Sequence, residues 1–237
     1  MPRFLVTAGN TREMIDRVRD WGNVFTGNTG YGIARALAER GSVDLLTSNS
    51  VHAAEAAAHG IGASTFRTHA DLDDLLRRCV TGVPYDAIFM TAAVADYRPT
   101  RVYSVASRES RDDGSEVWVV RDAQAGKVKS DHPAVAVLGE RTEKLVDKFR
   151  RDWGFGGTLV KFKLEVGVTE ADLLATAERS RVASGANYLV ANTLDMVRDT
   201  AGETGGRGAG AFLLAEGTHE WVPRDRLAER LADLVTK

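Results

Sequence analysis

Apolar and polar positions along the chain follow two periods, one typical of buried strands and the other of amphipathic helices. In the first half, apolar runs at 3–6, 43–47, 64–68 and 85–93 are separated by helical patterns at 31–40, 51–60 and 71–80. In the second half, strands are expected at 158–162 and 187–192, and helices at 142–153 and 170–184. This alternation predicts a Rossmann-like α/β fold, an open parallel sheet with helices on both faces.

Two segments depart from the alternation. Residues 99–130 are polar but contain the strand-like EVWVV at 116–120, which predicts a two-stranded β flap at about 100–130. Because its own chain could not bury the apolar residues of such a flap, the flap suits either a partner subunit or a mobile active-site cover. Near the C-terminus, a glycine-rich connector at 202–210 precedes AFLLAE and HEWVP, which should form a hairpin before a last helix at 225–235.

The composition limits the size of the core and the class of partner. Of the 237 residues 43% are hydrophobic, and we expect a single domain over 1–237. The net charge of −2 gives no field that would attract nucleic acid or an anionic membrane. No apolar run could span a bilayer and no signal-peptide pattern follows Met1, so a cytoplasmic protein is expected. The single cysteine, Cys79, falls in a helical pattern and is interpreted as a packing residue.

The loop after the first strand is the strongest functional signal in the sequence. It is longer than an ordinary βα loop, and its apolar residues are expected to anchor it, namely Ile15, Val18, Trp21, Val24 and Phe25. Gly27, Gly30 and Gly32 would let backbone N–H groups approach an anion at the start of the next helix, which favours a phosphate site. The alternative is that Gly9, Gly27 and Gly30 only form turns.

The end of the central strand, MTAAVADYRP, carries a second candidate site. Ligands of open parallel sheets bind beyond the carboxyl ends of the strands, where Ala92 and Ala93 leave room. Asp96 is expected to face this crevice. The alternative interpretation is that the Ala-Ala-Val segment only packs and that Asp96 caps a loop.

Five ordered segments together resemble phosphopantothenoylcysteine synthetase, the ligase of coenzyme A biosynthesis. They are TAGNTRE with the following VR and GNVFTGNTG, then AAVADYRP, GKVKS, VKFKLE and LVANTLD. The resemblance covers most of the chain and implies a Rossmann-like, homodimeric enzyme whose flap serves dimerisation. Because nothing in the sequence resembles the flavin-dependent decarboxylase that many bacteria fuse to this ligase, a stand-alone form is expected.

The resemblance also implies which residues bind the two larger substrates. For 4'-phosphopantothenate they are Asn23, Ala92, Ala93 and Asp96, with Arg19 reaching the substrate of the neighbouring subunit. For the nucleotide they are Gly9, Gly27, Gly30, Met90, Thr91, Asp96, Lys127, Phe162 and Asn192. Lys127 would balance the triphosphate charge, Phe162 would pack against the base, and Asn192 would hydrogen-bond the nucleotide.

The implied reaction has two steps. The carboxylate of 4'-phosphopantothenate attacks the α-phosphate of a nucleoside triphosphate, which releases pyrophosphate, and the amine of cysteine then attacks the acyl-nucleotide. Mg²⁺ is the implied cofactor, and CTP is preferred over ATP as the co-substrate. Lys127 and Asn23 are the expected catalytic residues, and Asn23 would hold the acyl-nucleotide and orient its carbonyl.

Three positions depart from the pattern of the family. Asn10 replaces the second glycine of a pair, Phe25 replaces a serine that contacts nucleotide phosphate, and Asn28 replaces a frequent basic or polar residue. Because Phe25 removes a hydroxyl donor, a non-catalytic nucleotide- or metabolite-binding relative is an alternative. A dinucleotide-dependent reductase is a weaker alternative, since the glycines do not follow the first strand directly and no Tyr-x-x-x-Lys pair exists.

Overall fold

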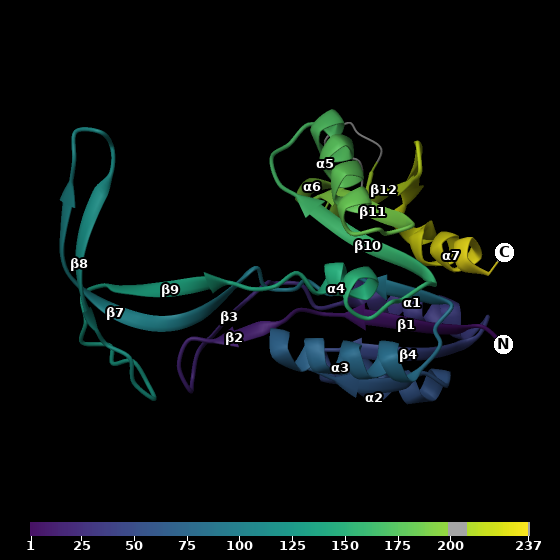
Figure 1. Cartoon of the computed structure of the whole chain (residues 1–237), viewed down its shortest axis with the longest axis horizontal. Coiled ribbons are helices and arrows are strands. Elements are labelled where there is room, and N and C mark those ends of the chain that lie inside the picture. The colour runs from purple at the N-terminus through teal and green to yellow at the C-terminus, as the bar shows by residue number, and fades with distance from the viewer. Residues whose placement is uncertain (199–207, 237) are drawn as a thin grey trace.

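An eight-stranded mixed sheet forms the centre of the computed structural model, which describes residues 1–198 and 208–236 (Figure 1). The strand order is β13-β12-β11-β10-β6-β1-β4-β5. The parallel strands are β1 (Arg3–Ala8), β4 (Ser42–Thr47), β5 (Gly62–Thr65), β6 (Ala87–Met90), β10 (Thr158–Glu165) and β11 (Tyr188–Thr193). At one edge, β12 (Gly210–Ala215) and β13 (Thr218–Pro223) form the expected antiparallel hairpin. The predicted fold class is therefore confirmed, and the connector at 202–210 falls mostly outside the described residues.

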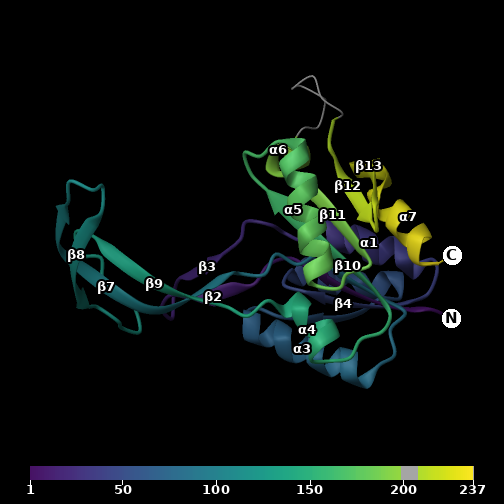
Figure 2. The same ribbon diagram turned by 45° about the horizontal axis from the view of Figure 1, so that its top comes forward.

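Helices cover both faces of the sheet (Figure 2). One face carries α1 (Asn28–Ala38), α2 (Ser50–Ala56) with the short η1 (Ala57–His59), and α7 (Arg224–Val235). The other face carries α3 (His69–Gly82), α4 (Leu145–Arg151) and α5 (Glu170–Ala183). A short helix that the sequence analysis did not predict, α6 (Leu194–Arg198), follows β11 directly.

Successive residues of the central strands enter different cores. In β1, Phe4 and Val6 pack under α1 and α7, whereas Leu5 packs under α3 and α4. In β10, Val160 and Leu159 divide in the same way. Positions that are buried on both faces of a sheet are mostly apolar, which is why 4–6 and 87–90 read as continuous apolar runs in the sequence, whereas Lys161 interrupts the run of β10.

A three-stranded arm projects from the edge of the sheet where the parallel strands end (Figure 1). Its strands are β7 (Tyr97–Ser110), β8 (Glu116–Asp122) and β9 (Val135–Arg141), in the order β8-β7-β9. The prediction of a two-stranded flap was therefore wrong, because β9 pairs with the first half of β7 over 97–104. The arm exposes Trp118, Val119 and Leu138 by 42%, 54% and 46%, which confirms that its own chain leaves apolar residues uncovered.

The long loop after β1 folds back as a hairpin of β2 (Arg12–Met14) and β3 (Asp20–Gly22). The predicted apolar anchoring was wrong for three of its residues, since Val18, Trp21 and Val24 are 62%, 43% and 85% exposed. Polar contacts hold this hairpin in place instead of apolar burial.

The buried carboxylate of Asp16 provides those contacts in the turn between β2 and β3. It accepts hydrogen bonds from the backbone N–H groups of Val18 (2.8 Å), Arg19 (2.9 Å) and Val128 (3.1 Å). These N–H donors, first that of Val18, lower the pKa of Asp16. Because Val128 belongs to the segment between β8 and β9, Asp16 joins the hairpin to the arm.

Lys161 is a buried cation in the middle of β10. Its side chain is directed toward α5, where Nζ donates to the carbonyl oxygen (3.1 Å) and the hydroxyl (3.0 Å) of Ser180. Among the described residues no carboxylate pairs with it, and burial lowers its pKa to about 8. The folded protein therefore holds a cation with two neutral acceptors and little water.

We expect Lys161→Met to raise the free energy of unfolding at pH 7 by about 1–2 kcal/mol. This gain is smaller than the full pKa shift of Lys161 implies, because the variant loses the two hydrogen bonds that Nζ makes in the wild type. Between the folded pKa of about 8 and the ordinary lysine value, the unfolded chain binds more protons, so wild-type stability rises with pH in that window. The gain of the variant should therefore shrink between pH 8 and pH 10. Urea denaturation of both proteins at pH 7 and pH 10 tests this, and a constant gain would contradict it.

Candidate functional site

A cavity of about 270 Å³ lies at the carboxyl ends of the parallel strands. The loop before α1 contributes Gly9, Phe25, Thr26, Gly27, Asn28, Thr29 and Gly30. The strand ends contribute Thr91, Ala92, Ala93, Phe162, Lys163, Leu164, Val190 and Asn192. The C-terminal part contributes Met196, Val197, Gly210, Ala211, Arg224 and Leu227. The cavity thus brings together eight predicted residues, Gly9, Gly27, Gly30, Thr91, Ala92, Ala93, Phe162 and Asn192, which come from four separate parts of the sequence.

The glycines of the loop allow a close approach of α1 to β1. Gly27 precedes α1 with a φ of +88°, and a Cβ there would lie 2.8 Å from the Cα of Gly9. A Cβ on Gly30 would lie 2.8 Å from both the Cβ of Ala8 and the carbonyl oxygen of Thr7. No side chain caps α1, so its first N–H groups face the cavity without a capping partner among the described residues. Such N–H groups at a helix N-terminus bind anions.

Asn10 braces the loop that carries Asn23. Its backbone N–H donates to the hydroxyl of Ser48 (2.9 Å), and its side-chain Nδ2 donates to the carbonyl oxygen of Asn23. Nδ2 of Asn23 in turn donates to the carbonyl oxygen of Ala93 (3.4 Å) at the cavity wall. The change from glycine to Asn10 therefore adds a buried side chain that holds Asn23 against the strand ends.

Asp96 faces a second, smaller cavity rather than the first. This cavity has a volume of about 180 Å³ and lies at the base of the arm, between β3 and the start of β7. It is lined by Asn23 and Asp96 together with Trp21, Gly22, Ala95 and Tyr97. The carboxylate of Asp96 accepts no hydrogen bond within residues 1–198 and 208–236, so it is available to a ligand. Asn23 of the second cavity donates to the carbonyl oxygen of Ala93 in the wall of the first, so the two cavities are adjacent.

Three predicted residues line neither cavity. Arg19 donates from Nη2 to the carbonyl oxygen of Val128 (3.0 Å), and Lys127 is exposed on the same segment between β8 and β9. Met90 is buried in the core under α3 and α4. Arg19 and Lys127 are therefore neighbours on the arm side of their own chain, and their functional roles remain predictions.

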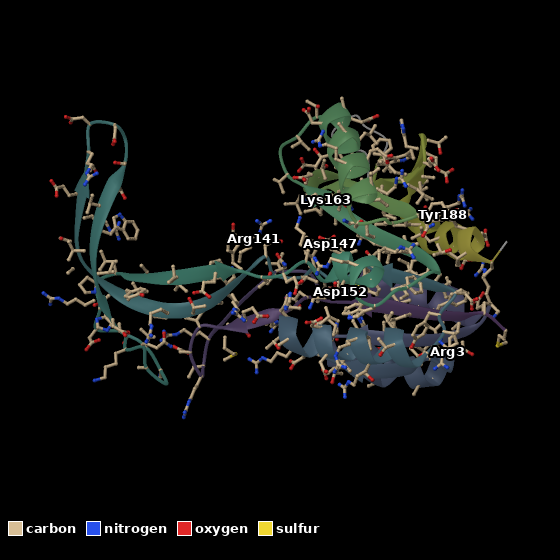
Figure 3. All side chains as sticks on the ribbon, viewed as in Figure 1. Arg3, Arg141, Asp147, Asp152, Lys163 and Tyr188 are labelled. Carbon is tan, nitrogen blue, oxygen red and sulfur yellow. The ribbon has the colours of Figure 1, made fainter. Side chains whose placement is uncertain are left out.

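The sequence analysis missed the C-terminal wall of the cavity. Strand direction and register explain the position of this wall. β12 runs antiparallel to β11, and Gly210 at the start of β12 pairs with Pro223 at the end of β13. The helix α7, which follows Pro223, therefore begins at the carboxyl ends of the parallel strands, as α1 does. The hairpin was predicted from the sequence, but its register was not. The analysis also overlooked Lys163, which lies near the carboxyl end of β10 (Figure 3) and pairs with Glu165 (3.0 Å).

The described residues contain no group of three His, Cys, Asp or Glu side chains arranged to hold a metal ion. Within the same part of the chain, no helix has the length and apolar character needed to cross a membrane. Asp96 is the carboxylate that lines the second cavity together with Asn23.

Residues 2–117 match the family described as the DNA/pantothenate metabolism flavoprotein C-terminal domain. The "Coenzyme A biosynthesis bifunctional protein CoaBC" of Thermococcus kodakarensis is 29% identical over 99% of this chain and 51% of its own length. The protein of the same name from Mycolicibacterium smegmatis is 30% identical over 98% of this chain and 52% of its own length. The chain thus spans about half the length of the curated relatives it matches.

Solved structures share the fold of the chain. The DNA/pantothenate metabolism flavoprotein of Streptococcus pneumoniae has a TM-score of 0.77 and 23% identity, over 99% of this chain and 98% of that one. A mutant of Cab2 in complex with phosphopantothenate-cysteine has a TM-score of 0.66 and 15% identity, over 99% and 85%. With the family match over residues 2–117, these findings confirm the resemblance of the sequence motifs. Residues 2–117 thus match the family of the DNA/pantothenate metabolism flavoprotein C-terminal domain, and the chain is similar to the phosphopantothenoylcysteine synthetases.

Proposed function

We propose that the chain is a phosphopantothenate–cysteine ligase, which activates 4'-phosphopantothenate with a nucleoside triphosphate and couples it to cysteine. The observation that carries this proposal is the pair of adjacent cavities. One has an uncapped helix N-terminus and strand-end residues that suit a nucleotide, and the other has Asn23 and Asp96 for a second substrate. Relatives named for coenzyme A biosynthesis and a related fold in complex with phosphopantothenate-cysteine support the same assignment.

In the first step, the phosphates of the nucleotide lie against the N–H groups at the start of α1. The carboxylate of phosphopantothenate then reaches the α-phosphate from the side of Asn23 and Ala93, where the two cavities meet. Holding both reactants at one junction lowers the barrier mainly through proximity. In the second step, the amide of Asn23 orients the carbonyl of the acyl-nucleotide for attack by the amine of cysteine.

Mg²⁺ is proposed to accompany the triphosphate. Magnesium sites of this kind often use one carboxylate together with phosphate oxygens, and Asp96 offers a carboxylate without a hydrogen-bond partner among the described residues. When bound, the ion would supply charge neutralisation on the phosphates. CTP is proposed as the preferred nucleotide over ATP on the motif resemblance.

A homodimer is proposed to complete the site. Arg19 and Lys127 lie near each other on the arm, outside both cavities of their own chain, and the arm exposes apolar side chains. Pairing of two arms would cover those side chains and place the two cations at the neighbouring subunit's cavities. Arg19 would then bind phosphopantothenate, and Lys127 the triphosphate.

Phe25 favours a second candidate function, a nucleotide- or metabolite-binding protein without turnover. Its side chain lines the cavity where the family has a hydroxyl, so it adds bulk and removes a donor from the phosphate region. The fold and the cavities would be the same in such a protein.

Pyrophosphate release from the purified protein distinguishes the two functions. The protein is incubated with 4'-phosphopantothenate and Mg²⁺, with CTP or ATP, and with or without cysteine. The ligase is expected to release pyrophosphate only with phosphopantothenate, to form nucleoside monophosphate only with cysteine, and to work faster with CTP. Nucleotide binding without pyrophosphate release under any of these conditions would identify the non-catalytic alternative.

A further inference from the structure

The first cavity contains two cations that the assignments above do not use. Of the residues that line it, Lys163 and Arg224 are positively charged, and none is Asp or Glu. Lys163 forms an ion pair with Glu165 (3.0 Å), so much of its charge is neutralised within the chain. Arg224 has no carboxylate partner among the described residues. A carboxylate-free cavity with an unpaired guanidinium favours an anionic ligand.

Two hydrogen bonds hold Arg224 at the cavity wall. Its backbone N–H donates to the carbonyl oxygen of Ala209 (3.0 Å), and its Nη1 donates to the carbonyl oxygen of Val197 (2.6 Å). Both acceptors are neutral, so the guanidinium keeps its full charge. Nε and Nη2 have no acceptor within residues 1–198 and 208–236, which leaves N–H donors for a ligand.

Gly27 lies at the start of α1 and Arg224 at the start of α7, and both residues line the cavity. The two helices are neighbours and run in the same direction. Near the end of α1, Arg40 pairs with Glu229 and Asp233 of α7, both at 2.7 Å, which fixes the two helices side by side and parallel. Their first residues therefore lie at the same edge of the sheet. A phosphate chain bound at the start of α1 can extend along this edge toward Arg224.

We propose that Arg224 binds the β- and γ-phosphates of the nucleoside triphosphate and stabilises the pyrophosphate as it leaves. The inference rests on the proposed function, in which a carboxylate oxygen forms a bond to the α-phosphorus while the bond from that phosphorus to the bridging oxygen breaks. The electron pair of the broken bond stays on the pyrophosphate, whose added charge the guanidinium neutralises. Phe25 offers no hydroxyl to this phosphate chain, so Arg224 supplies donors that the loop lacks.

Binding of three probes to Arg224→Gln tests the proposal. The probes are CTP, CMP and pyrophosphate, each with Mg²⁺, and affinities are measured by titration calorimetry. Loss of a charged hydrogen bond predicts a fall of about 10- to 100-fold for CTP and pyrophosphate and less than about 3-fold for CMP. Arg224→Lys, which keeps a point charge, should restore part of the pyrophosphate affinity. Arg226→Gln is the matched control, because Arg226 lies in the same helical turn but does not line the cavity.

The other outcomes either overturn the assignment of Arg224 or separate it from the proposed ligase activity. An equal loss for CTP and CMP would mean that Arg224 contacts the nucleoside, and unchanged affinities would mean that it only joins α7 to α6. A wild-type protein that binds CTP and pyrophosphate with the expected dependence on Arg224, but never releases pyrophosphate with phosphopantothenate, would refute the ligase and leave the phosphate site standing. A wild-type protein that binds none of the probes would refute both.

Discussion

Replacing Gly27 by alanine is expected to lower kcat/KM of the ligase reaction by at least about 100-fold and the free energy of unfolding by about 2–4 kcal/mol. Gly27 has a φ of +88°, where an L side chain is strained. The new Cβ would also contact the backbone nitrogen of Gly9 and lie 2.8 Å from its Cα. Because both neighbours are backbone atoms, relief requires a shift of either the end of β1 or the start of α1. Either shift moves the N–H groups away from the phosphate.

Gly32→Ala is the matched control for this prediction. Gly32 lies in the same helix, but no heavy atom lies within 4 Å of the position where its Cβ would be. In a helix interior, alanine is more favourable than glycine by up to about 1 kcal/mol, so the control should be equally or more stable and fully active. Urea denaturation and pyrophosphate release on both variants test the pair. A Gly27→Ala protein with activity within about threefold of wild type would show that α1 does not need this close approach.

The sequence predicted the sheet well because physical constraints act on every residue of its strands. Residues 4–8 of β1 and all of β6 are buried, so each of these positions is apolar or small, and the pattern is visible without an alignment. Burial constrains the residues of the arm strands less strongly. In β9, whose sequence is VAVLGER, every residue is exposed or half-buried without regular alternation, and only pairing with β7 makes this segment a strand. Its existence depends on a partner about forty residues away in the chain, which local patterns do not reveal.

The anchoring of the long loop was predicted from the wrong class of residue. Apolar residues in a loop suggest burial, but Val24 is exposed, and the buried group is the carboxylate of Asp16. Its role depends on three backbone N–H groups, one of which comes from Val128 on the far side of the arm. A charged residue in a loop sequence normally indicates solvent, so nothing local distinguishes Asp16 from a surface residue.

The candidate site was predictable to the extent that glycines and strand ends mark it. Gly27, Gly30 and Ala93 were recognised because a close approach or an open strand end requires small residues there. Arg224 was not, since its place at the cavity follows from the direction of β12 and from the Gly210–Pro223 register. The roles proposed for Arg19 and Lys127 involve a second copy of the chain, and within their own chain the two residues line neither cavity.

Asn23→Asp is expected to separate the two steps of the reaction. The variant keeps the shape of the side chain but loses both N–H donors, including the one that bonds the carbonyl oxygen of Ala93 at 3.4 Å. It also places a negative charge where the phosphate of the acyl-nucleotide would lie. We expect acyl-nucleotide formation in a single turnover to persist at a reduced rate, and amide formation with cysteine to fall by about 100- to 1000-fold.

Rapid-quench measurement of the acyl-nucleotide, before and after the addition of cysteine, tests this prediction. Asn28→Asp is the control for charge alone, because Asn28 lines the first cavity at the first position of α1 and forms no hydrogen bond with Asn23. Repulsion of the phosphates should raise the nucleotide KM of the control and leave the rate of amide formation from bound acyl-nucleotide unchanged. If Asn28→Asp slows that step as much as Asn23→Asp, the effect is electrostatic and general. If Asn23→Asp turns over normally, Asn23 does not orient the reacting carbonyl, and the second step relies on binding alone.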